Sequence, residues 1–524
     1  MDTPFPTRAR RGLGLTLAAS AMLVLAGPQS LSAAPAKSRS AAKAPAPAAD
    51  PFTRGKELFK QGKLADALAA FQEAEKKSPK DAVVQSWLGF VHFKLRRHDE
   101  AIQHLRASLE LSPNDPDTYN NLGNAYLAKG EVEPAIAAYQ QAVEKVKDRP
   151  GGQSDFHYNL GNALVKKGDL DAALASFQEA ERQAPKDALV QNNLGYVYER
   201  KYAALPDPKM LEKAVAHYRK ATELAPKSAV FYRNLGLAAR RQEGGAAEAV
   251  TALTRAVELD ARDFSSHLAL AEEHQAAGKT AEAIASYRSA IGLRPNEFVP
   301  RYNLGLLYAR QAAQTGNNTQ RLRHYNSSLV ELQQAVKIEP KDPRALSAMG
   351  YVCFKAGKTK DAAEWYRKAL EVAPDSQAAH ANLGLVLERL ANPEGAIRHW
   401  REAVRLDPAD AETRVLLASA YLSQGMHEEA VAEYREVLKL KQDGSVYNNL
   451  GFALEKLSRT DEAIAAYKQA VEANPKLAVA HNNLGACYAR QGQKDLARQH
   501  YQKALEIDPK FADAKKNLDR LGGS

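Results

Sequence analysis

Cysteine, tryptophan and methionine are scarce in this chain of 524 residues, which holds two, three and five of them. The two cysteines, Cys353 and Cys487, fall in widely separated helical segments, about 40 Å apart if each packed helix layer adds about 10 Å. Because a disulfide needs Cα atoms within about 7 Å, we expect both thiols to be unpaired, small buried residues. The sequence therefore excludes a disulfide-stapled fold.

Sequence signals of catalysis are also missing. No stretch has the pattern of a β-strand, no glycine-rich phosphate loop is present, and neither a His-Glu-x-x-His nor a Cys-x-x-Cys spacing occurs. His267 and His274 share a helical face, but without a third ligand such a pair is more typical of core or surface than of a metal site. We therefore predict no catalytic residue, no metal and no cofactor, and hence no enzyme.

Charge of one sign is in only small excess. Formal net charge is +10, and residues 1–51, with six basic and two acidic residues, leave +6 for the rest. Lysines and arginines alternate with glutamates on helix faces, which is typical of solvated surface rather than of a nucleic-acid track. Arg321, Arg323 and His324 form one local basic cluster, which we interpret as a solvated helix extension rather than an anion site.

What the chain does contain is a unit that recurs almost every 34 residues. The copy Tyr447 to Pro475 reads YNNLGFALEKLSRTDEAIAAYKQAVEANP. Its apolar and small residues fall on two helical faces, and the second follows the i, i+1, i+4, i+7, i+8 spacing of an amphipathic helix. Gly451 and Ala463 are small where two paired helices would approach most closely, and Pro475 ends the second helix. Each unit is thus predicted to be a helical hairpin.

This unit resembles the tetratricopeptide repeat (TPR), with an aromatic or apolar residue, Leu-Gly three residues on, then Tyr, Ala, an aromatic residue, Ala and Pro. About 13 copies tile residues 52–511, with insertions near 201–213 and 311–327 and a short break at residues 150–153. We expect Pro206 and Pro208 to make the first insertion a loop. The resemblance implies an all-α fold, a right-handed superhelical TPR solenoid of helix-turn-helix repeats.

Glycine marks the hairpin turns. In seven repeats a glycine follows the first helix at the same place, where a left-handed residue ends a helix without a side-chain penalty. These glycines are Gly62, Gly130, Gly168, Gly278, Gly357, Gly425 and Gly492.

The two ends of the chain have different compositions. Residues 1–34 place Arg8, Arg10 and Arg11 before an apolar run and then small residues, the order of a cleavable signal peptide. The run is too short for a bilayer span, so no transmembrane anchor is expected after cleavage, and Arg10-Arg11 leaves twin-arginine export as an alternative to the general route. Residues 35–51 read as a disordered Ala/Pro-rich linker, and residues 512–524 as a C-terminal capping helix.

Asparagine precedes the Leu-Gly pair in most repeats. In the family the first helix of each hairpin lines the concave surface, so the resemblance implies that these carboxamides face a groove. The pattern is similar to the asparagine ladder in the superhelical arm of O-linked N-acetylglucosamine transferases, and such a ladder can hold a peptide backbone. Alternatively, these asparagines cap or bridge neighbouring helices. With three further residues one past the glycine, the candidate peptide-binding residues are Asn121, Asn159, Asn193, Asn234, Asn303, Asn382, Asn449, Asn483, Asn124, Asn162 and Tyr196.

Three functional hypotheses follow. The first is a non-enzymatic scaffold or adaptor, exported to the periplasm or bacterial envelope, that binds extended segments of partner proteins in its groove. The second is a structural subunit of an envelope secretion, polysaccharide-export or motility complex that docks folded partners on its outer surface and insertions. The third, an enzyme, would need the scattered histidines to assemble a metal site. No three consecutive repeats supply the Lys, Asn and Arg set by which some family members clamp a terminal carboxylate, and neither nucleic acid nor a small-molecule cofactor is expected as a partner.

Overall fold

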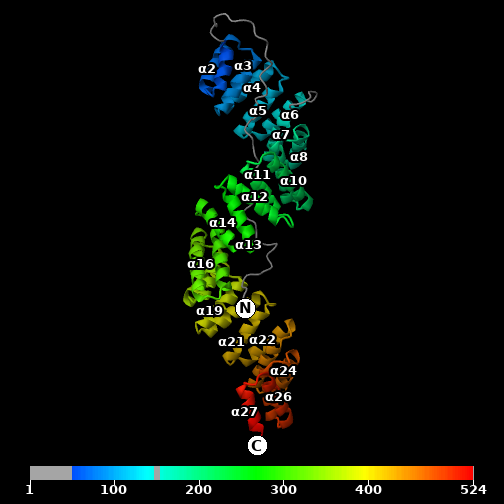
Figure 1. Cartoon of the computed structure of the whole chain (residues 1–524), viewed down its shortest axis with the longest axis vertical. Helices are drawn as coiled ribbons and strands as arrows, with labels where there is room; N and C mark the ends of the chain where they lie inside the picture. Colours follow the sequence, from blue (N-terminus) through cyan, green and yellow to red (C-terminus); the bar gives the residue numbers. More distant parts are fainter. Residues whose placement is uncertain (1–49, 147–153, 523–524) are drawn as a thin grey trace. The chain divides into compact units, whose positions relative to one another are not determined.

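The protein is helical throughout the part described by the computed structural model, residues 50–146 and 154–522. No β-strand occurs in that part, and its 27 helices follow one another in the chain as thirteen hairpins and one final helix (Figure 1). The first helix of each hairpin has an odd number and the second an even number. This confirms the all-α repeat fold expected from the sequence.

The structure divides into two compact units, residues up to Leu293 and residues from Arg294 onward. The helices of the first unit are α1 (Pro51–Lys60), α2 (Leu64–Lys77), α3 (Ala82–Lys94), α4 (His98–Leu111), α5 (Pro116–Lys129), α6 (Val132–Lys145), α7 (Ser154–Lys167), α8 (Leu170–Gln183), α9 (Ala188–Ala204), α10 (Pro208–Leu224), α11 (Ala229–Ala239), α12 (Ala246–Leu259), α13 (Phe264–Ala276) and α14 (Thr280–Leu293).

The helices of the second unit are α15 (Phe298–Gln314), α16 (Asn318–Ile338), α17 (Pro343–Lys355), α18 (Thr359–Val372), α19 (Gln377–Arg389), α20 (Pro393–Leu406), α21 (Ala411–Ser423), α22 (His427–Leu440), α23 (Gly444–Lys456), α24 (Thr460–Ala473), α25 (Ala478–Arg490), α26 (Lys494–Ile507) and α27 (Ala512–Gly522). Within each unit, the second helix of one hairpin packs on the first helix of the next. The signal peptide, most of the linker and the break at 150–153 lie outside the described residues.

Close approach of the two helices within a hairpin depends on the repeat glycine. A Cβ atom at Gly451 would lie 2.7 Å from the ring of Tyr467, which is fully buried. Glycine and an aromatic ring meet in the same way at Gly123 and Tyr139 and at Gly195 and Tyr218. A side chain larger than hydrogen would push the ring away, so the sequence prediction of close helix pairing is confirmed.

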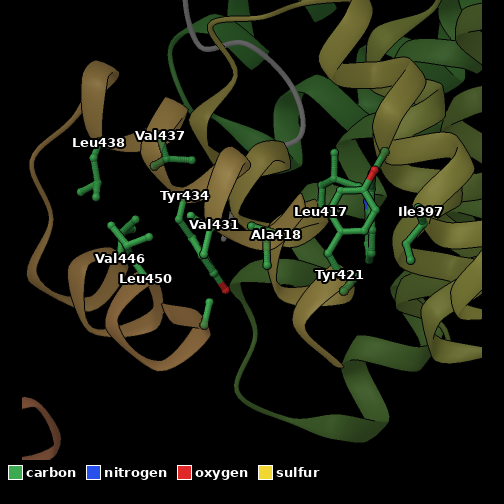
Figure 2. Packing of buried hydrophobic residues seen from close by; sticks show 14 of the residues in the cluster. Ile397, Leu417, Ala418, Tyr421, Val431, Tyr434, Val437, Leu438, Val446 and Leu450 are labelled. Atoms are coloured by element: carbon green, nitrogen blue, oxygen red, sulfur yellow. The ribbon is translucent and has the colours of Figure 1, made fainter. Parts of the chain in front are cut away.

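The hydrophobic core runs along the interior of each unit, between first and second helices. Figure 2 shows part of the core of the second unit, where Ile397 of α20, Leu417 of α21, Tyr434 of α22 and Leu450 of α23 gather. These side chains are 0–8% exposed. Because each hairpin buries its apolar residues against its neighbours, no hairpin has a separate core.

The hairpin turns also form as the sequence predicts. All seven turn glycines have positive φ, between 73° and 94°. In three other repeats the same left-handed place is taken by Arg96, Ala391 and Ser458, with φ of 59°, 55° and 61°. Aspartate side chains begin several first helices by accepting from backbone N–H groups, as Asp187, Asp410 and Asp443 do.

The two insertions lengthen helices instead of forming loops. The expectation of a loop at 201–213 is wrong, because α9 and α10 each run for 17 residues and only residues 205–207 connect them. Pro208 is compatible with this arrangement because it occupies the first turn of α10, where its missing N–H is not needed. The insertion at 311–327 likewise extends α15 and α16, which places Arg321, Arg323 and His324 on a helix as interpreted from the sequence.

Other sequence predictions concern single residues and the chain end. Cys353 and Cys487 are both buried and free, as expected. A final helix, α27, follows the last hairpin where a capping helix was predicted, and it packs against α26. Among the described helices, none combines the length and the apolar character that crossing a membrane requires.

Candidate functional site

Asparagine side chains of neighbouring first helices are hydrogen-bonded to one another in the first unit. Asn234 of α11 donates to Oδ1 of Asn192 of α9 at 2.8 Å, and Asn192 donates to Oδ1 of Asn193 at 2.9 Å. Asn193 in turn donates to Oδ1 of Asn162 of α7 at 2.9 Å. We call such a chain of carboxamides an asparagine relay. It joins three consecutive hairpins.

A second asparagine relay runs through the end of the second unit. Asn517 of α27 donates to Asn482 of α25 at 3.0 Å, and Asn483 donates to Asn448 of α23, also at 3.0 Å. Within α25 and α23, longer contacts of 3.4 Å link Asn482 to Asn483 and Asn448 to Asn449. The relay therefore ties the capping helix to the last two hairpins.

The relays correct the predicted peptide-binding role of three asparagines. Asn193 and Asn234 have no exposed surface, and Asn162 has 3%. The prediction that these residues face an open groove is wrong, because their side chains are buried and their amides form hydrogen bonds that link neighbouring hairpins. This is the bridging alternative that the sequence left open.

The remaining candidates are half-buried. Asn159 donates to Asn120 at 2.9 Å, Asn124 accepts from the hydroxyl of Tyr139 at 2.7 Å, and Tyr196 accepts from Arg200 at 3.3 Å. Asn449 and Asn483 belong to the second relay. Three asparagines make no side-chain hydrogen bond within the described part and stay candidates for binding, namely Asn121, Asn303 and Asn382.

A second recurring device was missed from the sequence. The residue three before the repeat leucine donates to the carbonyl six residues earlier, near the end of the preceding hairpin, as His380 does to Pro374 at 3.0 Å and Arg414 to Pro408 at 3.0 Å. The same side chain usually pairs with the second helix of its own hairpin. We call this arrangement the polar latch, and its first-helix residues are Gln85, His267, Arg301, His380, Arg414 and His481. The available signal was a polar residue where the repeat pattern has an aromatic or apolar one.

The chemistry of the polar latch differs between the two units. In the first unit Gln85 pairs with His104 at 2.7 Å, and Gln191, at the same repeat position, pairs with His217 at 2.8 Å. In the second unit two latches are histidine pairs, and Nδ1 atoms lie 2.9 Å apart in one of them, His380 with His399. The pair His481 and His500 repeats this geometry at 3.1 Å.

Cations recur on the first helices at a third position, five residues after the repeat glycine or the alanine that replaces it. We call this the plus-five position. Ten of the thirteen repeats have lysine or arginine there, namely Lys60, Lys94, Lys166, Arg200, Arg241, Arg310, Lys355, Arg389, Lys456 and Arg490. A cation near a helix C-terminus is favoured by the helix dipole, which explains part of this preference. The sequence reading did not single these residues out.

Aromatic rings lie beneath several of these cations. At the plus-one position, one after the repeat glycine, Phe452 carries Lys456 above its ring at 5.0 Å from the centroid, and Tyr351 carries Lys355 at 5.7 Å. The pairs Phe90 with Lys94 and Tyr196 with Arg200 repeat this arrangement in the first unit. Plus-one and plus-five side chains lie one turn apart and together form what we call the first-helix face.

Ion pairs show how successive first helices align along this face. Arg241, at the plus-five position of α11, donates to Glu199 of α9 at 2.9 Å, and Arg490 of α25 donates to Glu455 of α23 at 2.6 Å. Both glutamates occupy the plus-four position of the preceding repeat. Burial raises the pKa of Glu199, whose carboxylate also accepts from the hydroxyl of Tyr218 at 3.0 Å. A plus-five side chain therefore reaches the plus-four residue of the hairpin before it.

Within the described residues, no group of three or more histidine, cysteine, aspartate or glutamate side chains could hold a metal ion. The fold is that of an α-helical repeat protein, and its recurring surface side chains, the plus-one aromatic residues and the plus-five cations, lie along the first helices.

Comparison with known families identifies the repeat. A family model described as a tetratricopeptide repeat matches residues 52–116, 120–188, 158–203, 239–298 and 381–445, and related repeat models match 350–390 and 442–510. The chain belongs to the tetratricopeptide repeat family. Proteins of this family act as protein-interaction scaffolds and bind other proteins, and the repeat fold is generally non-catalytic.

Curated relatives resemble only part of the chain. BBSome complex member BBS4 of Bos taurus is 36% identical over 89 residues, 17% of this chain and 17% of its own length. The Hsp70-Hsp90 organizing protein of Triticum aestivum is 31% identical over 91 residues, 17% of this chain and 16% of its own length. Each match thus spans well under a third of the relative.

Two solved structures are also similar to the chain. The C-terminal part of a TPR repeat-containing protein from Cytophaga hutchinsonii is 20% identical with a TM-score of 0.40, covering 48% of this chain and 97% of that one. The APC/C hetero-tetramer Cut9-Hcn1 is 15% identical with a TM-score of 0.32, covering 90% of this chain and 98% of that one.

Proposed function

We propose that this protein is a non-enzymatic scaffold that binds an extended segment of a partner protein along its first-helix face. The observation that supports the proposal is that the first helices carry two separate groups of side chains, one that joins hairpins and one that faces solvent. Asparagine relays and polar latches hold neighbouring hairpins together, while plus-one and plus-five side chains recur in register and remain accessible. A surface that repeats with each hairpin suits a partner that is itself a linear chain.

Several repeats must contribute for such binding to be stable. A hydrogen bond or an exposed ion pair contributes about 1 kcal/mol or less, whereas an extended segment loses conformational freedom when it is ordered. Half-buried apolar side chains such as Tyr351 and Leu385 add contact area beside the cations. We therefore expect a segment that spans three or more hairpins.

Photo-crosslinking tests this proposal with a matched control. A photoreactive phenylalanine analogue replaces Phe452, which is 40% exposed on first helix α23, or Leu440, which is 49% exposed on second helix α22. We expect partner capture from position 452 and little from position 440. Equal capture from both positions, or capture from 440 alone, would contradict binding along the first-helix face.

We also propose that the protein is exported to the bacterial periplasm or envelope. Support comes from residues 1–34, where three arginines precede an apolar run and a small-residue segment. Fractionation of cells that express the full chain tests this proposal, and the mature protein is expected outside the cytoplasm with a mass reduced by the leader. Full-length protein confined to the cytoplasm would contradict it.

Docking of a folded envelope subunit on the outer surface is the second candidate function. The long helix α16 exposes Leu322 by 52% and Val330 by 57%, and these two apolar side chains offer contact area to a folded partner. Replacing both with serine should abolish complex assembly under this alternative and leave crosslinking from position 452 unchanged under the first.

A further inference from the structure

Unpaired cations on the first-helix face follow a simple rule. Where the plus-four residue of the preceding repeat is glutamate, the plus-five cation pairs with it inside the protein, as Arg241 and Arg490 do. Where that residue is apolar, the cation has no such partner. Lys355 and Arg389 follow repeats whose plus-four residues are Ala309 and Phe354.

Lys456 of α23 fits the same rule, because the plus-four residue before it is Leu422. Lys355, Arg389 and Lys456 are all exposed, and none lies within ion-pairing distance of a carboxylate in the described part of the chain. Their charges are therefore available to an external anion.

Apolar side chains accompany these cations one helical turn away. Tyr351, Leu385 and Phe452 stand at the plus-one positions of α17, α19 and α23, and each is at least partly exposed. Phe452 is 40% exposed. The surface from α17 to α23 thus combines a row of cations with a row of apolar residues, which favours a ligand that carries both carboxylates and apolar groups.

The spacing of the hairpins sets the spacing of the ligand's charges. Neighbouring first helices such as α17 and α19 contact each other, and packed helix axes lie about 8–10 Å apart. An extended chain in the polyproline II conformation advances about 3.1 Å per residue with three residues per turn, so about three residues span one hairpin and every third side chain lies on the same face. Carboxylates at every third residue would therefore meet successive cations.

One hairpin interrupts the row. At α21 the plus-five residue is Ser423, and the preceding plus-four residue is the exposed Glu388. A carboxylate at this point would meet a like charge instead of a cation, which is unfavourable. The matching ligand therefore has acids facing Lys355 and Arg389, none at the next step, and another facing Lys456.

We propose that the surface from α17 to α23 binds an extended acidic protein segment with carboxylates at every third residue, apolar residues between them, and one acid omitted opposite Glu388. This inference rests on the proposed scaffold function and names its partner chemistry. Glu388 and the apolar row favour a peptide over a nucleic acid, whose phosphates recur without interruption.

Peptide binding to the full-length protein tests the inference. The probe is a synthetic fluorescent peptide with the acid spacing given above, acetylated and amidated so that no terminal carboxylate contributes. A second peptide of identical composition has its acids at every second residue, and a single-stranded oligothymidylate serves as the nucleic-acid probe. We expect the first peptide to bind at least tenfold more tightly than the other two, with an affinity that falls as salt rises.

Matched variants identify the surface. The triple variant Lys355→Ala, Arg389→Ala, Lys456→Ala should weaken binding of the first peptide by about 10- to 100-fold, at up to about fivefold for each exposed pair. The control Arg367→Ala, Arg398→Ala, Lys468→Ala removes three exposed cations from second helices and should change binding by less than about threefold. Because all six residues are exposed, both variants should fold, which circular dichroism checks.

Exchanging the charges of the protein and the peptide separates loss of binding from loss of folding, because a misfolded variant would not bind the exchanged peptide. Lys355→Glu should weaken the first peptide, and a peptide with lysine in place of the facing acid should restore binding. Equal binding of the two acid spacings, equal loss in both triple variants, or tighter binding of oligothymidylate would overturn the inference. If position 452 captures a partner while no acid-spaced peptide binds, the scaffold function stands and the acidic-segment inference fails.

Discussion

The Nδ1 atoms of His380 and His399 lie 2.9 Å apart, a hydrogen-bonding distance between two imidazole rings. The carbonyl of Pro374 can only accept, so Nε2 of His380 carries a hydrogen and its Nδ1 acts as the acceptor. His399 therefore donates through its Nδ1. When both rings are charged, an N–H group on each Nδ1 faces the other and the hydrogen bond is lost, whereas a pair with one charged ring keeps it because the neutral ring can accept at Nδ1.

Acidification should loosen the second unit before the first. Burial lowers the pKa of His399 to about 4, with further lowering by His380, Arg398 and Arg367. Since the unfolded chain titrates near 6.5, the unfolded state binds more protons between pH 6.5 and about 4. The stability contribution is complete above pH 6.5 and declines until the pH falls below about 4.

The charges around the other polar latches also predict that the second unit loosens at a higher pH than the first. Burial also lowers the pKa of His481, with further lowering by Lys503, and the pKa of His500, with further lowering by His481 and Lys468. In the first unit the pKa of His104 and His217 is lowered by burial but raised in part by Glu75 and Glu181. Hydrogen exchange followed by mass spectrometry from pH 7.5 to 4.5 should show faster opening of α19–α20 and α25–α26 than of α3–α4.

A variant that replaces the latch histidines of the second unit with glutamine, the residue found at Gln85, is the control for acid sensitivity. Gln85 donates to the Pro79 carbonyl and receives a hydrogen bond from His104, and both contacts are compatible with a charged histidine. The variant His380→Gln, His481→Gln should therefore reduce the acid sensitivity of the second unit. An unchanged pH dependence of exchange in α19–α20 would contradict this explanation.

A methyl group at a repeat glycine should destabilise its hairpin. Gly451→Ala places a Cβ 2.7 Å from the Tyr467 ring, and such overpacking costs about 1–3 kcal/mol. Gly292→Ala is the matched control, because nothing lies within 4 Å of its Cβ position, and this helical site should gain up to about 1 kcal/mol. Denaturant melts should give opposite signs, and equal effects would argue against close helix approach.

Hairpin turns in which a residue other than glycine adopts the left-handed conformation can be stabilised by glycine. Ala391 and Ser458 occupy the turn with φ of 55° and 61°, a conformation that costs residues with a Cβ about 1 kcal/mol or more. Ala391→Gly and Ser458→Gly should each raise the unfolding free energy by about 1 kcal/mol, whereas Gly357→Ala should lower it by a similar amount. Thermal melts of the three variants check this order.

Relay asparagines should matter for stability. Asn234→Ala leaves the buried Asn192 carboxamide without its donor and should lower the unfolding free energy by about 1–3 kcal/mol. Asn382→Ala, at the same repeat position but half-buried and without a side-chain hydrogen bond in the described structure, should change it by less than about 0.5 kcal/mol. Similar losses in the two variants would argue against a structural role for the relay.

The sequence was sufficient for the fold because its signals are local. The small residues Gly451 and Ala463 predict the close pairing of two helices, and glycine at a fixed place predicts seven of the left-handed turns. Pro206 and Pro208 misled the interpretation of their segment, since proline in the first turn of a helix is as favourable as proline in a loop.

The candidate site was less predictable because it depends on contacts between hairpins. Asn234 and Asn382 occupy the same repeat position, yet only Asn234 meets a carboxamide on its neighbour. The composition of a repeat does not reveal which asparagines are buried by that pairing. The unpaired cations were visible in principle, because Lys355 and Arg389 follow apolar plus-four residues, but their significance required the contact between Arg490 and Glu455 to fix the alignment of the helices.

The most direct test of the account is to map which partner residues are captured from Tyr351, Leu385 and Phe452 when each carries the photoreactive side chain in turn. Binding of one extended segment along the first helices predicts three crosslinks in chain order on a single stretch of the partner, either ascending or descending. Crosslinks scattered over a folded partner, or no capture from any of the three positions, would contradict it.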